Sequence, residues 1–598
     1  MKKISKMALL AVAGMISLPQ AFAQEAEEET FATEESEYTA DFGDDFGGGF
    51  DDFGSDDSAP TYYINAETGV DMRGYIGTYD GSAFNSGYET KSQAEVFDSL
   101  TDASAYANMT LGYSAQNSEM EFKLKFDGNS LGDYNQDILD EATARLFLGN
   151  WVIEGGKMKV VWGKGDKLHV LDNFNANDYT DFIFGDYIDR RIAEPMLHVK
   201  YNVPNTNWSV EGVYTPMMTA DRFASSGVWA PAKQSQMTST ISDSAKTLLA
   251  SAISDLENAR TIASTASALK NNAIVSNIAN PTAAATAAAQ AVGGYLTANA
   301  DVKEKLTEYG LKTDMTNAAD AIEAYLTAAN TTYTNALNNA SAMSSDSSVL
   351  YPDTNQLRYG QAGIRVLGTV GSVDLGASYY YGHYKQPSFN AAKLQSALTT
   401  YLTTGELSED EKFLAYDQKQ TFGLEAAFVV WKFNTRWELG YNLTKDSAGD
   451  NPWIHNNSVE WLGGFDVNLP IHNMNLNVQE TGKYILNNDK IEDGAYKVYD
   501  VDYNSDGKYI NNRVVMNLSD NFLYENLKPE VTVIWGIENN EWCVQPKVNY
   551  KVADGMNLGV SGGVLYCYNE NGEFYNFTAD STKWHTKSFV QASVRYEF

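Results

Sequence analysis

The chain has 598 residues and a formal net charge of −35 at pH 7, with 37 Tyr, 46 Gly, 13 Pro and only 2 Cys. A chain with this large a negative charge is not expected to bind nucleic acid, because the phosphates would repel it. Many Tyr and Gly with few Pro are typical of numerous short strands with aromatic side chains at their ends, rather than of a soluble enzyme.

The N-terminus has the three parts of a secretory signal peptide. A positive start is followed by an apolar run over 7–18, which is too short to span a bilayer, and then by Ala21-Phe22-Ala23, a small-x-small cleavage pattern. We therefore expect residues 1–23 to be removed. Beyond them no stretch approaches 18 consecutive apolar residues, so the sequence predicts no transmembrane helix.

Residues 24–60 form an acidic tail of low complexity, with repeated Asp-Phe-Gly units. Such a composition cannot bury a core, so we expect the tail to be disordered in the periplasm. A small hatch or a partner-binding tail is the alternative interpretation. The tail is far too short to be the folded plug of an energised transporter.

From about Thr68 onward, apolar and polar residues alternate with period two, which predicts strands with one apolar face. The clearest case is the last strand, where Val590, Ala592, Val594, Tyr596 and Phe598 share one face. A soluble sandwich also alternates. However, one face is apolar and the other polar in nearly every strand, short turns alternate with long loops, and the chain ends on a strand. These features favour a closed barrel whose apolar face meets lipid.

The fold class predicted for residues 61–598 is therefore all-β: a transmembrane antiparallel up-and-down β-barrel of about 18 strands, with 16 as the alternative. Closure is needed because lipid offers no partner to a free backbone N–H or C=O. The short connections are expected on the periplasmic side and the long ones outside. The eight short connections are 114–118, 149–150, 203–207, 369–372, 432–434, 469–473, 524–529 and 553–555.

The largest external connection, residues 220–353, is rich in Ala, Ser, Thr and Asn. It carries helical patterns over 245–256, 302–311 and 318–326, with a break near Pro281. We expect an Ala-rich helical insertion. A surface cap is the first interpretation, and a plug of the pore or an adhesive surface are the alternatives.

The C-terminal strand resembles the assembly signal of Gram-negative outer-membrane β-barrel proteins, the porin-like class. The residues that carry this resemblance are Val594, Tyr596 and Phe598, preceded by Val590 and Ala592 on the same face. The resemblance implies a location in the cell outer membrane, with membrane lipid and the barrel-assembly machinery as partners. An oligomer is compatible with this class, and the sequence does not determine one.

The third external loop, residues 163–194, resembles the third loop of general porins, which folds into the barrel and faces basic wall residues. Carboxylates opposed to cations select solutes by charge and dipole. The acidic candidates for a pore constriction are Asp172, Asp178, Asp181, Asp186 and Asp189. The basic candidates on the wall are Lys123, Lys125, Arg145, Lys157, Lys159, Arg365 and Arg436, with Lys200 farther round. The alternative is a loop that is merely acidic and exposed.

Selectivity is harder to predict, because carboxylates share the inward face of the strands with these basic residues. They include Glu121, Glu211, Asp374, Glu425, Glu438, Glu460 and Asp466. With acidic external loops concentrating cations at the mouth, the pattern leans to a weak cation preference.

Residues 502–507 copy the first half of a calcium loop, with Asp502, Asn504 and Asp506 on alternate positions before a glycine. The twelfth position, which should be a bidentate Glu, is Arg513. We interpret the segment as a polar loop tip and at most a weak Ca²⁺ site.

The two cysteines, Cys543 and Cys567, fall on consecutive strands and on the same inward face. Counting from the turn at 553–555 places them opposite each other or one diagonal step apart. The periplasm permits a disulfide, and a diagonal register would put their Cα atoms near the limit for one. Bridged and free cysteines both stay open.

No catalytic or metal-binding constellation emerges, because the six histidines are scattered and no phosphate loop or nucleophile elbow is present. We therefore predict no enzyme and no cofactor. The predicted function is a porin-like channel for passive diffusion of small hydrophilic solutes, based on architecture alone. The alternatives are a substrate-specific outer-membrane transporter and a surface adhesin or receptor that uses residues 220–353.

Overall fold

The computed structural model describes residues 60–75, 101–131, 138–181, 187–224, 229, 231–314, 317–567, 569, 571–576 and 588–598. The predicted signal peptide, residues 24–59 of the acidic tail and Asp186 lie outside the described residues. Helices in the described part are all too short or too polar to cross a membrane.

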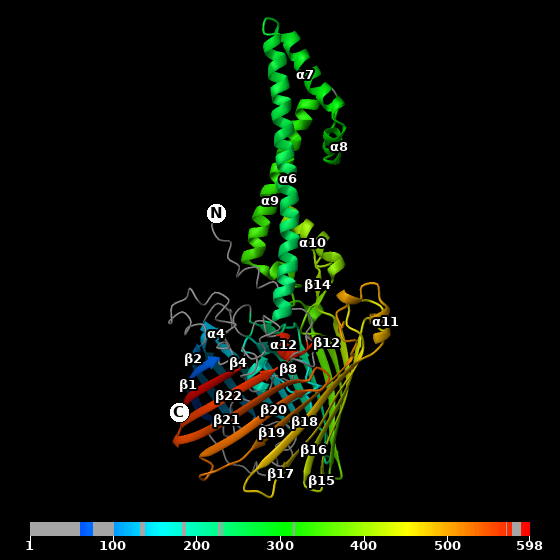
Figure 1. Cartoon of the computed structure of the whole chain (residues 1–598). Coiled ribbons are helices and arrows are strands. Elements are labelled where there is room, and N and C mark those ends of the chain that lie inside the picture. The colour runs from blue at the N-terminus through cyan, green and yellow to red at the C-terminus, as the bar shows by residue number, and fades with distance from the viewer. Residues whose placement is uncertain are drawn as a thin grey trace. The chain divides into compact units, whose positions relative to one another are not determined.

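Eighteen antiparallel strands form one closed barrel, as the alternation predicted (Figure 1). The strands are β1 (Thr61–Tyr75), β2 (Thr101–Ala115), β3 (Ser118–Phe126), β4 (Leu139–Leu148), β5 (Trp151–Met158), β8 (Glu194–Asn202), β9 (Trp208–Thr215), β11 (Gln361–Val370), β12 (Val373–His383), β15 (Gln418–Val430), β16 (Phe433–Thr444), β17 (Ser458–Asn468), β18 (Asn475–Ile485), β19 (Ile510–Ser519), β20 (Leu527–Gly536), β21 (Glu541–Ala553), β22 (Met556–Tyr566) and β23 (Phe589–Glu597).

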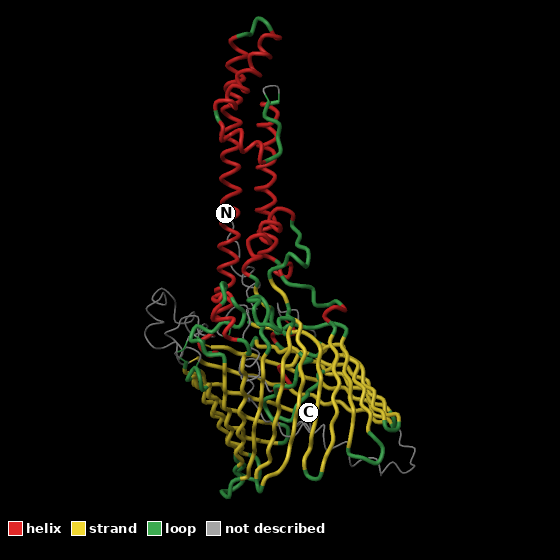
Figure 2. The backbone as a smooth tube through the Cα atoms, turned by 90° about the vertical axis from the view of Figure 1, so that its right-hand side faces the viewer, coloured by secondary structure: helices red, strands yellow, loops and turns green. Residues whose placement is uncertain are grey.

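The barrel closes where the first strand pairs with the last. β1 pairs with β23 from Glu67 opposite Glu597 to Tyr75 opposite Phe589, and every other strand pairs with its neighbours in the ring. Figure 2 shows these strands as one continuous wall, in yellow. Each strand therefore has a partner on both sides, so the wall has no free edge.

One predicted turn was displaced. Lys528 and Pro529 were predicted in a connection, but β20 starts at Leu527 and includes both residues. The proline occupies the third position of the strand, and its carbonyl accepts a hydrogen bond from the Asp520 backbone N–H at 3.1 Å. Near a strand end, proline costs one ladder donor only, so the strand tolerates it.

The two faces of the wall differ as the alternation predicted. In β23, the outward-facing Val590 and Val594 are 48% and 46% exposed, whereas the inward-facing Gln591 is 2% exposed. The outer surface is therefore apolar, and the polar and charged side chains of the strands lie in the lumen.

The insertion forms a separate compact unit of residues 236–352 and 390–413, drawn in red in Figure 2. Its helices are α6 (Ala232–Ser276), α7 (Pro281–Ala298), α8 (Ala300–Glu308), α9 (Ala318–Ser345) and α10 (Ala391–Thr404). Pro281 begins α7 at the first helical position, where its missing N–H costs nothing, and Asn280 caps that helix. The unit has its own apolar core, which includes Leu256, Val292 and Tyr325.

The second segment of this unit, residues 390–413, was missed by the sequence analysis. It comes from a different connection, between β12 and β15, and α10 packs on α9. The side chain of Asn339 donates to the carbonyls of Tyr401 and Leu402 at 3.2 and 3.1 Å.

The remaining elements are short pieces in the connections. They are β6 (Ala176–Tyr179), β7 (Arg191–Ile192), β10 (Arg222–Phe223), β13 (Ser388–Phe389), β14 (Leu414–Ala415), α4 (Gly128–Leu131), α5 (Tyr187–Arg190), α11 (Asn488–Asp493), α12 (Glu573–Asn576), η4 (Ser347–Leu350), η5 (Leu357–Tyr359) and η6 (Lys497–Tyr499).

An apolar cluster fills part of the lumen against strands β17 to β23. It joins loop side chains such as Leu168 and Leu171 to wall side chains such as Leu462, Ile534 and Leu565. The lumen therefore has an apolar, packed side and, as described next, a charged side.

Candidate functional site in the barrel lumen

The connection between β5 and β8, of which residues 159–181 and 187–193 are described, crosses the lumen. It leaves the wall at β5 and reaches strands on the opposite side of the ring. The Asp166 carboxylate lies 2.8 Å from Arg436 of β16 and from Asn477 of β18, and the Leu168 N–H donates to Gln479 at 3.3 Å. We call residues 159–193 the inner loop.

One wall carboxylate, Glu438 of β16, holds the inner loop. One of its oxygens accepts the backbone N–H groups of Lys164 and Gly165 at 2.7 and 2.8 Å. The other accepts those of Val170 and Leu171 at 2.8 and 3.2 Å. A fifth contact comes from the His169 ring nitrogen at 3.2 Å. The loop thus wraps its N–H groups around a single buried negative charge, an arrangement that suits an anion.

This wrapping needs glycine at two positions. Gly163 has φ +125, and a Cβ there would lie 2.3 Å from the Glu438 carboxylate. A Cβ on Gly165 would lie 1.8 Å from the Leu168 carbonyl oxygen. The second clash is with backbone, which cannot rotate away, so the loop can adopt this turn only with glycine at 165.

We therefore expect Gly165→Ala to detach the inner loop from Glu438 and to make residues 159–181 accessible to protease in the purified protein. Gly294→Ala is the matched control, because a Cβ there meets nothing within 4 Å in the interior of α7. That change should stabilise the helix by roughly 1 kcal/mol. Equal protease resistance of the two variants would contradict the steric argument.

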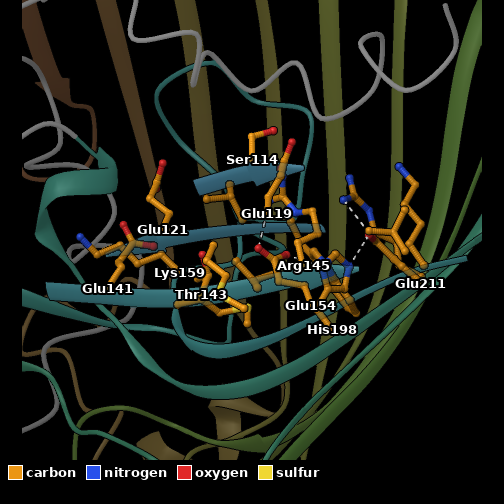
Figure 3. Close-up of a pocket in the computed structure, with 18 of the residues that line it drawn as sticks. Ser114, Glu119, Glu121, Glu141, Thr143, Arg145, Glu154, Lys159, His198 and Glu211 are labelled. Atoms are coloured by element: carbon orange, nitrogen blue, oxygen red, sulfur yellow. Dashed lines mark hydrogen bonds and ion pairs between the residues drawn. The ribbon is translucent and has the colours of Figure 1, made fainter. Parts of the chain in front are cut away.

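A row of alternating charges runs along the wall on the other side of the lumen, across six strands from β3 to β11 and on to β15. We call it the charge ladder: Glu119, Arg145, Glu154, His198, Glu211, Arg365 and Glu425. The successive distances are 3.2, 3.0, 3.4, 3.1, 3.1 and 2.7 Å. Figure 3 shows its first members, with Arg145 beside Glu119 and Glu154.

Strand register explains the ladder. Glu119 lies opposite Arg145, Arg145 opposite Glu154, Glu154 opposite His198, and Glu211 opposite Arg365. Opposite charges at directly paired positions attract each other across strands. His198 bridges Glu154 and Glu211 through its two ring nitrogens, and an imidazole donates from both nitrogens only when it is protonated.

Arg365 connects the ladder to the inner loop. It contacts Glu211 at 3.1 Å and Glu425 at 2.7–2.8 Å, and it donates to the Gly163 carbonyl at 3.3 Å. Arg365 is only 6% exposed, so its contacts with the two carboxylates and with the loop backbone are shielded from water.

Between the ladder and the inner loop lies a cavity of about 380 Å³. The ladder lines it from Glu119 to Arg365, and Trp162, Gly163 and Lys164 line it from the loop. Figure 3 shows the labelled wall side chains gathered around this space. The open, polar part of the lumen is thus on the β2 to β11 side.

The predicted acidic constriction residues have local partners. Asp172 pairs with Arg191 inside the loop, Asp178 with Arg222 at 3.2 Å, and Asp181 with Arg73 of β1 at 2.9 Å. Asp189 and Asp178 act electrostatically on Lys125 of the wall. Asp181 thus forms an ion pair with a barrel strand, and its partner Arg73 was not predicted.

Most of the predicted basic wall residues face the lumen, but they bind carboxylates of the wall more often than of the loop. The prediction is wrong for Lys157, which lies opposite Ala142 and Pro195 on the outer face of β5, one residue out of phase with the inward-facing Glu154 and Met158. Lys123 pairs with Glu141 at 3.1 Å, and Lys125 with Asp127 at 3.3 Å. Lys159 pairs with Asp140 at 2.9 Å, and Lys157 donates to the Leu139 carbonyl. Arg145 belongs to the ladder, and Arg436 binds Asp166 of the loop and Asp466 of β17. Cross-strand pairs, not two opposed rows, thus account for most of these charges.

The calcium candidate is corrected by the structure. Asp502 is buried, with one oxygen 2.9 Å from the His455 ring and the other accepting the Asn456 N–H at 2.7 Å. Asn504 accepts the Asp506 N–H, and Asp506 bonds Asn569. The three side chains serve different partners, and no group of acidic, His and Cys side chains in the described ranges could hold a metal ion.

The same external connection contains a carboxyl group that titrates near neutrality. Burial raises the pKa of Asp500 to about 7, with the negative charges of Asp502 and Asp446 adding to the effect. In the unfolded chain this group ionises near its ordinary value of 3.8. Between these two pH values the Asp500 carboxyl keeps its proton in the folded protein but has lost it in the unfolded chain. The contribution of Asp500 to the free energy of unfolding is therefore largest below about pH 4 and falls as the pH rises toward 7.

We expect amide hydrogen exchange over residues 496–509 to be slower at about pH 4.5 than at about pH 6.5, after correction for the intrinsic pH dependence of exchange. Asp500→Asn, which cannot ionise, should remove the difference. The neighbouring His455 stays protonated in the folded protein over this pH range, because its pKa is raised above the ordinary value of 6.5. Identical pH dependence in the variant and the wild type would refute the assignment.

Cys543 and Cys567 both face inward and are buried, and the structure does not join them by a disulfide. Cys543 lies opposite Leu565, so Cys567 is two residues farther along β22 and its extension. The diagonal alternative therefore describes the register of the two cysteines, and a disulfide between them stays a prediction.

Sequence reasoning placed Glu211, Glu425 and Glu438 inward but missed their partners. The spacing of His198 and His169 predicts no metal site, and neither these histidines nor Glu119, Glu154 and Arg73 were predicted as site residues. Inward parity combined with strand register would have found Glu119, Glu154 and His198, because they are cross-strand neighbours of predicted residues. No sequence signal would have found the contact of His169 with Glu438.

Comparisons with known proteins give little. No protein-family model and no curated protein matches the chain. Among solved structures, an engineered variant of the porin of Rhodobacter blastica covers 90% of this chain and 100% of its own, with 8% identity and a TM-score of 0.31. OpdO of Pseudomonas aeruginosa covers 90% and 96%, with 7% identity and a TM-score of 0.38. Function must therefore be argued from the geometry of the lumen itself.

Proposed function

We propose that the chain is a porin-like channel in the outer membrane of a Gram-negative-type cell, which passes small hydrophilic solutes passively. The observation that carries the proposal is the closed ring of 18 strands, apolar outside and charged inside, around a polar cavity. Such a wall suits hydrocarbon on one side and water on the other.

In this proposal the inner loop is the constriction. It crosses the lumen, and its fixation to Glu438 leaves the polar passage on the side of the charge ladder. Solutes would pass along alternating charges, which bind ions weakly and transiently and order water. Asp172, Asp178 and Asp181 would contribute by holding the loop through their ion pairs, and Asp189 through its attraction to Lys125.

The assembly role of the last strand is part of the same proposal. Val594, Tyr596 and Phe598 lie on the outward side, are 46%, 41% and 73% exposed, and would be accessible to the barrel-assembly machinery. The rings of Tyr596 and Phe598 pack edge to face at 4.7 Å, which fixes the terminal aromatic next to the strand.

Single-channel recording of the purified full-length protein in planar bilayers tests the function. Ohmic current steps in KCl support the channel. Absence of current, from protein whose folded barrel is verified by its resistance to unfolding in detergent, would refute it. Current that saturates with one solute would instead favour the substrate-specific transporter.

One observation favours a second candidate, an adhesin or receptor that uses the helical unit. At the end of α6 and in the turn that follows it, Val275 and Ile278 are 67% and 78% exposed, so the unit presents apolar side chains there. Val275→Asp with Ile278→Asp should abolish binding of the full-length protein to a host or matrix surface without changing its current. Unchanged binding would exclude this surface.

A further inference from the structure

The cavity beside the charge ladder has hydrogen-bond donors without acceptors, and we propose that it binds a small oxyanion, a carboxylate or a phosphate, next to Trp162 and Lys164. The inference rests on the proposed channel function and names the class of solute that binds inside the channel. A cavity of about 380 Å³ is within the range of small-molecule sites.

The acceptors of the cavity are already engaged by the wall. Glu119 accepts from Arg145, and Glu154 accepts from Arg145 and lies beside His198. Glu211 is shared between His198 and Arg365. The carboxylates of the cavity are therefore already paired with cations of the wall. A solute that offers hydrogen-bond donors would bind them only weakly.

The donors from the inner loop are not so engaged. The indole nitrogen of Trp162 is buried and has no acceptor among the described residues, although the ring packs against Phe174 at 4.9 Å. The Lys164 ammonium has no ion pair within the part of the chain that the structure describes. A buried donor without an acceptor is costly, so a ligand that supplies acceptors is favoured here.

The electrostatics of this corner point the same way. Lys200 of β8 lines the cavity, where Glu211 attracts its ammonium but Arg365 and Lys164 repel it. Lys164, Lys200 and Arg365 thus lie near one another, with Glu211 and Glu425 as the neighbouring carboxylates. An oxyanion placed between Lys164 and Lys200 would relieve this repulsion and accept hydrogen bonds from both ammonium groups.

The test is a titration of the single-channel current in KCl with potassium acetate and with potassium phosphate as separate arms, which distinguish the two sources of oxyanion. We expect saturable block by at least one of them. Lys164→Gln should raise the half-blocking concentration about tenfold or more, since a hydrogen bond to a charged group is lost. Trp162→Phe, which keeps the ring and removes the donor, should raise it about fivefold.

Lys490→Gln, in the exposed helix α11, is the charge-matched control and should leave the block unchanged. Calorimetric binding of phosphate and acetate to the full-length protein in detergent provides a readout that does not depend on current. Binding without current would uphold the site and refute the channel. Ohmic current with neither block nor binding would overturn the site and leave the channel standing, as would equal block of Lys164→Gln and Lys490→Gln.

Discussion

Glu438→Ala is expected to release the inner loop from the far wall and to raise the single-channel conductance several-fold. The wild-type carboxylate accepts four backbone N–H groups and contacts His169, all inside the barrel. Each buried donor left without an acceptor costs about 1–3 kcal/mol. The loop can recover these hydrogen bonds only by moving into water, which widens the passage that it now narrows.

Planar-bilayer recording of the same protein preparation measures this change, and two variants calibrate it. Glu438→Gln retains one acceptor oxygen but turns an NH₂ group toward backbone donors, so an intermediate conductance is expected. Glu257→Gln removes a carboxylate from an exposed position of α6 and should leave the conductance unchanged. Wild-type conductance in Glu438→Ala, with an intact barrel, would show that the loop does not limit the passage.

Arg365→Met is expected to lower the free energy of unfolding of the barrel by about 3–5 kcal/mol, the range for breaking a buried ion pair by removing one partner. The change leaves Glu211 and Glu425 buried without their shared cation and removes the donor to the Gly163 carbonyl. Urea unfolding of the protein in detergent, followed by tryptophan fluorescence, measures it. The open channel should also become more cation-selective, which a reversal potential across a KCl gradient reports.

A compensating substitution separates charge from packing. Glu425→Gln in the Arg365→Met background removes one of the stranded carboxylates, so part of the lost stability should return. Arg365→Lys keeps the charge but cannot reach both carboxylates in a fork, and should fall between the wild type and Arg365→Met. If Arg365→Met unfolds at the wild-type urea concentration, the ladder carries no stability.

The sequence by itself determined the barrel. Strand alternation reflects which side chains meet hydrocarbon, and this is a local property that recurs every two residues within each strand between Thr68 and Phe598. The alternation predicted about 18 strands, with 16 left open, and placed Val590 and Gln591 on opposite faces of the last strand; the structure has 18 strands in the ring. The helical insertion was visible for the same reason, since helix periodicity over 245–256 and 318–326 is local as well.

Only the tertiary structure decided how the inner loop and the wall charges combine. Asp172, Asp178 and Arg436 were recognised as charged and correctly placed on loop or wall, but a charge does not state its partner. The partner of Arg436 in the loop is Asp166, and that of Glu438 is a run of backbone N–H groups that any sequence could supply. These contacts join residues about 270 positions apart, and they depend on the path that the loop takes once the ring has closed.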